Sequence, residues 1–201
     1  MNVSRRSLFS AAGSFAAAAL LKPLPSVADP DFVSPALVRR AMDALNAHAG
    51  AIPSRDVIAI ADFSLPSRTP RFHLLDVANA RVLSSHLVAH GRGSDPGHTG
   101  WLQRFSNMPS SNATSAGAYR TDGVYVGEHG RSIRLSGLDA SNDNALQRAI
   151  VLHAAWYVSP EMATTHGVLG RSEGCFALSN TDLPGVLARI GSGHMIYADK
   201  V

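Results

Sequence analysis

The only cysteine of the chain, Cys175, is the side chain with the clearest potential for chemistry. A lone cysteine has no partner in its own chain, so it cannot form an intramolecular disulfide. It follows the run Gly170–Gly174, whose small residues leave room for a substrate and offer backbone N–H groups. The first question is therefore whether a nearby base makes this thiol a nucleophile.

His153 is the best candidate for that base. It lies in the apolar run of residues 149–156, which predicts a rigid strand able to hold an imidazole in place. Gly174 and Cys175 lie before a predicted helix, in a turn whose N–H groups could face a developing oxyanion. The group that orients His153 is left open, and a backbone carbonyl would be sufficient. The alternative is that Cys175 is a small buried apolar residue and His153 a hydrogen-bonded core histidine.

Residues 1–28 have the pattern of an export signal and are set aside before the fold is considered. A twin-arginine pattern in Ser4–Phe9 precedes an alanine-rich apolar run, and small residues predict cleavage after Ala28. The run is too short to predict a membrane span. An ordinary secretory leader and a retained N-terminal anchor are the alternatives. All three place the domain outside the cytoplasm, in the periplasm or cell envelope.

The basic excess of the full chain comes from this leader. The chain has 18 basic and 15 acidic residues, and Arg5, Arg6 and Lys22 are the charged residues of the leader. The remaining domain therefore has no formal net charge, which argues against nucleic-acid binding, because that requires a concentrated basic face. A single cysteine in an exported chain also means that stability comes from packing rather than from disulfides.

Hydrophobic periodicity predicts one N-terminal helix followed mostly by short strands. Ser34 and Pro35 are typical of a helix start, and the helical pattern stops at Gly50. Residues 118–126 are expected to form a hairpin that turns at Asp122-Gly123. Further strands are expected at residues 57–61, 72–77, 82–89, 132–135, 149–156 and 194–198, the one around His153 being central.

Two short helices are expected late in the chain, one from Ser159 and one from the capping pair Ser179 and Asp182. The predicted fold is mainly β, a β-rich α+β domain with a mixed or antiparallel sheet in a sandwich or barrel and a few peripheral helices. The predicted organisation is a signal peptide (1–28), a linker (29–34), an N-terminal helix (35–50) and a catalytic domain (51–201).

The spacing of His153 and the later run Ser172-Glu173-Gly174-Cys175 resembles the L,D-transpeptidase catalytic domain (YkuD) family. Its motif is a histidine followed by Ser/Thr-His-Gly-Cys. Further segments are similar to the murein L,D-transpeptidase branch of that family, and the resemblance covers roughly residues 56–199. These segments are 63–68, 88–95, 105–107 and 170–175.

The resemblance implies acyl transfer on peptidoglycan stem peptides. Cys175 would attack the amide that follows diaminopimelate, His153 would protonate the departing D-Ala, and Gly174 would belong to the catalytic turn. The thioester would pass to a second stem, a protein, a D-amino acid or, in a carboxypeptidase reaction, water. The resemblance also implies the family's fold and sensitivity to carbapenems. No cofactor or metal is expected, because a nucleophile and a base suffice.

Two departures from the family pattern bear on substrate binding. Glu173 stands where the family has histidine, and Ala177 stands where it usually has arginine, two residues after the cysteine. Recognition of a substrate carboxylate must then come from elsewhere. We expect Arg92 and Arg171, with Ser172, to bind substrate, because a guanidinium matches a carboxylate in shape and charge. Structural surface arginines are the alternative.

Two other functions remain open at this point. The loop histidines suggest a zinc-dependent cell-wall peptidase or amidase, although no pair has helical zinc-ligand spacing. The departures at Glu173 and Ala177 are also compatible with a non-catalytic cell-wall-binding domain or with another thiol hydrolase. His90 and His129 could line the cleft, while hydrogen bonding to loop backbone is the simpler interpretation. The sequence does not indicate an oligomeric state.

Overall fold

The computed structural model describes residues 33–201. The expected signal peptide (1–28) and most of the expected linker (29–34) lie outside the described residues. Within residues 33–201, the helices are too short or too polar to cross a membrane.

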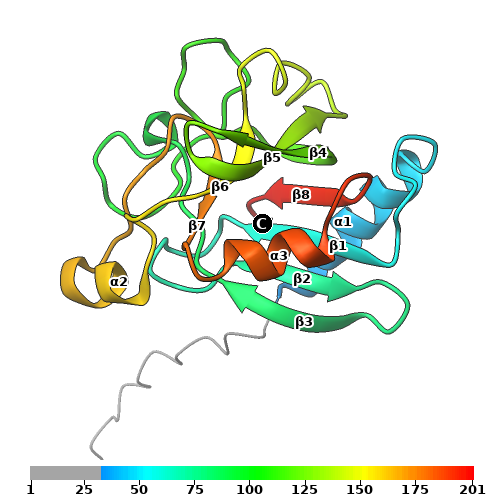
Figure 1. The fold of residues 1–201 in the computed structure, drawn as a ribbon, viewed down its shortest axis with the longest axis horizontal. Coiled ribbons are helices and arrows are strands. Elements are labelled where there is room, and N and C mark those ends of the chain that lie inside the picture. Colours follow the sequence, from blue (N-terminus) through cyan, green and yellow to red (C-terminus); the bar gives the residue numbers. More distant parts are fainter. Residues whose placement is uncertain (1–32) are drawn as a thin grey trace, which may run out of the picture.

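Eight strands form one mixed sheet in the order β3-β2-β1-β8-β4-β5-β6-β7 (Figure 1). Because β3 and β7 are not paired with each other, the sheet is not closed into a barrel. The mainly β prediction is confirmed, with an open sheet. The strands are β1 (Val57–Asp62), β2 (Phe72–Asp76), β3 (Arg81–His86), β4 (Gly117–Gly127), β5 (Gly130–Gly137), β6 (Val151–Ala154), β7 (Phe176–Leu178) and β8 (Met195–Asp199).

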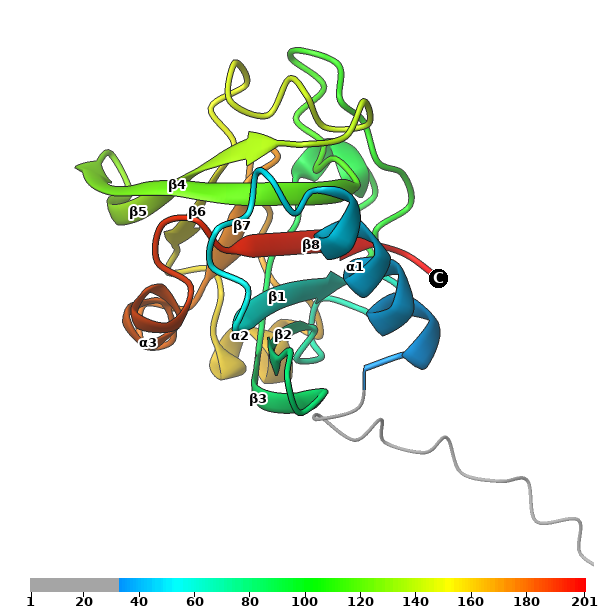
Figure 2. The ribbon, with the colours of Figure 1, turned by 90° about the vertical axis from the view of Figure 1, so that its right-hand side faces the viewer.

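The N-terminal helix α1 (Pro35–Ala47) covers β1 and β8 on one face of the sheet (Figure 2). Leu37, Ala41 and Leu45 recur every four residues along it, so they share one face, and all three are fully buried. Burying each leucine contributes about 2 kcal/mol. The helix ends before the stop predicted at Gly50, but the element itself is as expected.

The region 118–126 differs from the prediction. It is not a hairpin but the body of the long strand β4, and the chain turns later, at Glu128 and His129. The Asp-Gly pair instead causes a register shift between Thr121 and Val124. The Asp122 carboxylate accepts hydrogen bonds from Arg120 Nε at 2.7 Å and from Ser136 Oγ at 2.6 Å. These bonds satisfy Asp122 within a bulge rather than a turn.

Strands β6 and β7 bring the two candidate catalytic segments together. They pair in parallel, with His153 opposite Ala177. Cys175 directly precedes β7, so the expectation that a helix follows it is wrong; α3 (Leu183–Arg189) begins only after β7. β6 has a partner on each side but is second from the edge rather than central. Its burial comes from the loops and the core packed around it.

The two short helices begin as the sequence predicts. Ser159 caps α2 (Pro160–His166), its Oγ accepting a hydrogen bond from Met162 N at 3.1 Å. Before α3, Ser179 Oγ donates to Asp182 Oδ2 at 2.7 Å and accepts from Asp182 N at 3.0 Å. Ser159 thus fixes the chain before β7 and the Ser179–Asp182 pair fixes it after β7, the strand that Cys175 directly precedes.

Candidate active site

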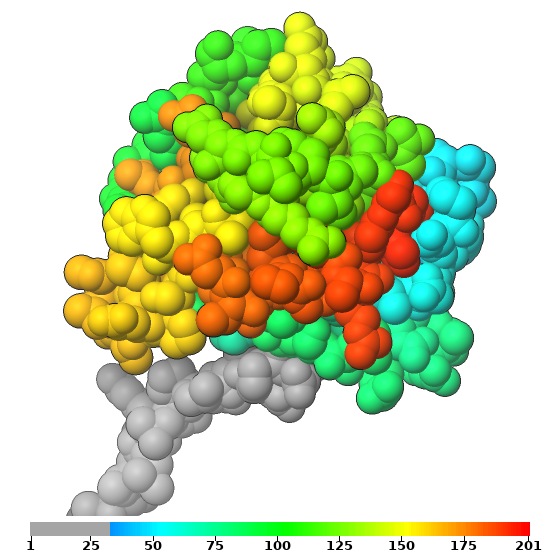
Figure 3. Space-filling model, viewed as in Figure 1, coloured from blue at the N-terminus to red at the C-terminus, as the bar shows by residue number. Residues whose placement is uncertain are grey.

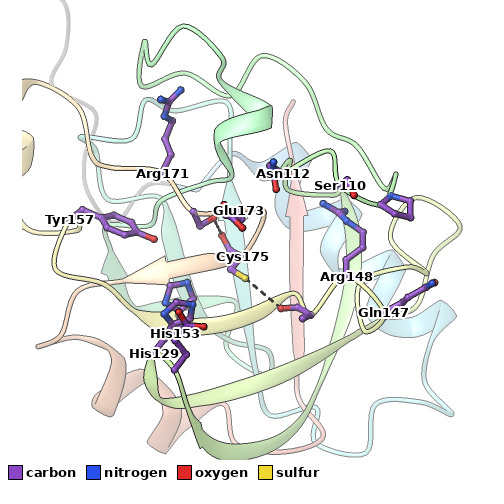
Figure 4. Close-up of a pocket in the computed structure, with 14 residues that line it drawn as sticks. Ser110, Asn112, His129, Gln147, Arg148, His153, Tyr157, Arg171, Glu173 and Cys175 are labelled. Carbon is purple, nitrogen blue, oxygen red and sulfur yellow. Dashed lines mark hydrogen bonds between the residues drawn. The ribbon is translucent and has the colours of Figure 1, made fainter.

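Cys175 and His153 line the same cavity, which has a volume of about 780 Å³ (Figure 4). Segments far apart in the sequence meet there: the loop before β4, the β4–β5 turn, the approach to β6 and the approach to β7. The lining residues are Pro109, Ser110, Asn112, Glu128, His129, Gln147, Arg148, Ala149, His153, Tyr157, Arg171, Ser172, Glu173 and Cys175.

The turn that presents Cys175 requires glycine at position 174. Gly174 has a φ of +119°, a conformation that side-chain-bearing residues rarely adopt. A Cβ there would lie 2.8 Å from both Ala113 O and Ile150 Cδ1. Ser172 Oγ closes the turn by donating to Cys175 O at 2.6 Å and accepting from Gly174 N at 3.2 Å. The sequence motif therefore encodes a rigid turn before the nucleophile.

The thiol of Cys175 is half-buried and held in a resting arrangement. Its Sγ lies 3.7 Å from Ala149 O, to which it can donate a weak hydrogen bond. Burial raises the pKa of the thiol, while hydrogen bonds from the Val151 and Cys175 backbone and the charge of Arg148 oppose that rise. In this structure the thiol is therefore neutral at neutral pH.

His153 is 2% exposed and is oriented by the backbone. Its Nδ1 lies 2.9 Å from Ala154 O, and because a carbonyl only accepts, Nδ1 carries the proton. Nε2 then keeps its lone pair. Burial, together with the nearby His129, lowers the pKa of His153, and the bond to Ala154 partly offsets this. A neutral imidazole with a free nitrogen beside a thiol cavity can accept a proton.

Arg148 is a cavity residue that the sequence analysis did not identify. Nη1 donates to Ser106 O at 2.9 Å and Ser115 Oγ at 2.7 Å, and Nη2 donates to Ser111 Oγ at 3.2 Å and to Ala113 O. Within residues 33–201 no carboxylate pairs with it. Figure 4 shows it on the opposite side of Cys175 from His153. No local pattern signals this role, because its partners lie more than thirty residues away.

The two arginines expected to bind substrate differ in position. Arg171 lines the cavity, and its Nη1 donates to Asp95 O and to Pro96 O at 3.3 Å. Arg92 lies at the exposed rim, where Nη2 pairs with Glu173 Oε1 at 2.9 Å. Glu173, which stands where the family motif has histidine, thus lines the cavity. Its ion pair with Arg92 holds that guanidinium at the cavity rim.

His129 lies against His153. The two rings stack with centroids 4.2 Å apart and planes 24° from parallel. A second cavity, of about 370 Å³, lies beside the first, and His129, His153 and Tyr157 line both. Exposed Trp156 borders the second cavity, so it is not a core residue. The sequence suggested that His129 could line the cleft, but not that it contacts His153.

The other loop histidines are dispersed rather than gathered. His98 Nε2 donates to Leu169 O at 2.8 Å, and His86 and His194 lie near Asp182 and Asp56. Across residues 33–201, no three metal-ligating side chains lie close enough together to hold a metal ion.

The family model for the L,D-transpeptidase catalytic domain matches residues 30–198, nearly the whole described chain. The chain belongs to the L,D-transpeptidase catalytic domain family. This confirms the resemblance on which the sequence analysis relied. No curated protein is similar enough to the chain to count as a relative.

Several solved structures are similar to this member of the L,D-transpeptidase family. An L,D-transpeptidase from Mycobacterium smegmatis is 13% identical, with 72% of this chain and 58% of that chain covered and a TM-score of 0.45. L,D-transpeptidase 3 from Mycobacterium tuberculosis, in complex with a faropenem-derived adduct, is 15% identical, with coverages of 72% and 60% and a TM-score of 0.45.

The helical cell shape determining protein Pgp2 from Campylobacter jejuni is 11% identical, with 74% of this chain and 48% of that chain covered and a TM-score of 0.49. The chain spans less than two thirds of the length of each of these three structures.

Proposed function

We propose that this L,D-transpeptidase family member is an exported enzyme that transfers acyl groups on peptidoglycan stem peptides. The observation that carries the proposal is the cavity that Cys175 shares with His153, whose Nδ1 is engaged and whose Nε2 is free. A thiol and a fixed neutral imidazole are the minimum for nucleophilic catalysis on an amide. Membership of the family supplies the substrate class.

The first step is a proton transfer from Cys175 to His153. The S–H bond breaks and an N–H bond forms at Nε2, which converts a neutral pair into a thiolate and an imidazolium. The thiolate attacks the carbonyl that follows the L-centre of diaminopimelate, and a thioester forms as the C–N bond breaks. The imidazolium returns its proton to the amine of D-Ala, which leaves. No net charge is lost at any stage.

Arg148 and the Cys175 turn stabilise the charges that develop. The Arg148 guanidinium lacks a carboxylate partner in the described chain, so its charge favours the thiolate and the oxyanion across the cavity. Gly174 acts through its conformation, because its N–H is engaged by Ser172 Oγ. We assign the oxyanion contact to the N–H of Cys175.

Arg171 and Arg92 are the proposed groups for recognition of a substrate carboxylate. Arg171 lines the cavity, and Arg92 acts at its rim, where Glu173 positions it. Ser172 contributes by holding the turn between them and Cys175. The acceptor for the thioester is a second stem, a protein amine, a free D-amino acid or water, and profiling of muropeptides from a deletion strain identifies which.

Covalent labelling tests the nucleophile. Purified protein incubated with a carbapenem should gain one adduct mass, and the adduct should map to Cys175. Cys175→Ser should remove the adduct with little change in fold, since the two side chains are similar in size. An adduct that persists in Cys175→Ser would assign the nucleophile elsewhere.

A non-catalytic wall-binding domain is the second candidate. The observation that favours it is the resting thiol, which contacts Ala149 O rather than His153 and has a raised pKa. This candidate predicts that the protein binds isolated sacculi but forms no adduct with carbapenems and releases no D-Ala from stem tetrapeptides.

A further inference from the structure

The β4–β5 turn places one histidine on another. The turn consists of Glu128 and His129, between the paired glycines Gly127 and Gly130. Gly130 has a φ of +70°, which lets the chain reverse in so few residues. Figure 3 shows the green hairpin at the surface, beside the yellow and orange segments that carry β6 and α3. The exposed β4–β5 turn therefore covers the buried part of β6 that carries His153.

At the tip of this hairpin, the His129 ring covers one face of His153. With ring centroids 4.2 Å apart, the two imidazoles are in van der Waals contact. The hydrogen bond from His153 Nδ1 to Ala154 O already fixes which edge of the ring faces the backbone. Backbone and hairpin together fix the plane and the rotation of the imidazole. Figure 4 shows both rings on the same side of Cys175.

We propose that His129 is a positioning residue for His153, and that its stacked ring stabilises the imidazolium formed when His153 takes the Cys175 proton. This inference rests on the proposed nucleophile–base pair. A neutral aromatic face attracts a cation placed over it. A protonated His129 has the opposite effect, because two positive charges in stacking contact repel each other. The state of His129 thus governs how readily Cys175 is activated.

Other charged groups near the two rings do not cancel the effect of His129 on the His153 imidazolium. Glu128 is beside His129 in the turn but exposed, and Arg148 lies on the far side of Cys175. Desolvation holds the pKa of His153 below its usual range, and coulombic repulsion from His129, which only a protonated His129 exerts, acts in the same direction. The titratable and charged groups that line the cavity around the rings are Glu128, Arg148, Tyr157, Arg171, Glu173 and Cys175.

The rate of Cys175 alkylation by iodoacetamide, measured across pH, tests the proposal without any cell-wall substrate. His129→Ala removes the stack and should slow alkylation about fivefold at neutral pH. His129→Phe keeps an aromatic face but cannot be protonated, so its neutral rate should stay within about twofold of wild type. In this variant the acid limb of the alkylation rate–pH profile should shift to lower pH by about one unit, because the repulsion between protonated His129 and protonated His153 is lost. Arg131→Ala, exposed on the same hairpin and outside the cavity, is the matched control.

The outcomes separate this inference from the proposed function. If His153→Ala slows alkylation but both His129 variants retain the wild-type profile, the positioning role is wrong and the nucleophile–base pair stands. Equal slowing in Ala and Phe variants with an unchanged acid limb would show a structural role only, and so would also overturn it. If His153→Ala changes nothing, the nucleophile–base pair itself is wrong. Should His129→Ala fail to fold, the profile of His129→Phe decides alone.

Discussion

His90 and His153 are both almost completely buried, yet they differ in what they can do. His90 is 1% exposed and His153 is 2% exposed. Burial lowers the pKa of both, that of His90 to about 3. Arg71 Nη2 donates to His90 Nδ1 at 2.8 Å, and Nε2 lies 3.6 Å from Asp95 Oδ2.

Among the described residues, each of these histidines has one hydrogen-bonded ring nitrogen, Nδ1, and in His153 the partner of Nδ1 is a backbone carbonyl. His90 lies between a guanidinium and a carboxylate, outside the cavity, and its own carbonyl accepts a hydrogen bond from Ser172 N at 3.0 Å. Burial alone therefore does not identify a base. What distinguishes the base is a free ring nitrogen that faces a cavity shared with a nucleophile.

The largest expected difference between the two histidines is in acylation. His153→Ala should lower the rate of carbapenem acylation of Cys175 by about 10²- to 10⁴-fold, because general-base catalysis is lost. The protein should remain folded, as the strand keeps its partners in β5 and β7. Stopped-flow fluorescence or time-resolved mass spectrometry measures the rate. A loss below about threefold would place the base elsewhere.

His90→Ala should have the reverse effect, a loss of stability rather than of chemistry. It removes a hydrogen-bond partner of the fully buried Arg71, at a cost of about 2 kcal/mol. Urea denaturation measures the free energy of unfolding. Acylation per folded molecule should stay within about threefold of wild type. A stable but inactive variant would contradict the division of roles drawn between the two histidines.

Burial of His90 and His153 should also make stability depend on pH. Because the pKa of His90 is lower in the fold than in the unfolded chain, the unfolded state binds more protons as pH falls below about 6.5. The free energy of unfolding should therefore fall by about 2 kcal/mol on account of His90 between about pH 8 and about pH 5, and the lowered pKa of His153 should add to this fall. His90→Gln should have a flatter dependence. An equal slope in that variant would exclude His90 as a contributor.

The smallest expected effect concerns Arg71, which contacts His90, and Arg148, which lies across Cys175 from His153. Arg148 has no carboxylate partner in the described chain, whereas Arg71 is enclosed by carbonyls and by His90. Arg148→Met should raise the pKa of Cys175, and Arg148→Lys, which keeps the charge, should restore most of the difference. The dependence of the Cys175 alkylation rate on pH measures this change in pKa. Equal profiles for the Met and Lys variants would show that Arg148 acts only through its hydrogen bonds.

Much of the fold follows from local sequence. The apolar spacing of α1, the caps before α2 and α3 and most strands were predictable, because each depends on residues a few positions apart. The β4 region was not. Asp122-Gly123 has the composition of a turn, but bonds from Arg120 and Ser136 hold Asp122 in a bulge. A partner on a neighbouring strand outweighed the local turn preference.

In the candidate site, too, some features follow from the sequence and others only from tertiary packing. By itself the sequence determined the single thiol, the glycine that its turn requires, the histidine on an apolar strand and the family to which they belong. Only the tertiary structure decided which nitrogen of His153 is free, that Arg148 lines the same cavity as the thiol and that His129 stacks on the base. The reason is physical. Residue type and short-range spacing are properties of the chain, whereas the orientation of a ring and the partner of a charge arise when distant segments pack together.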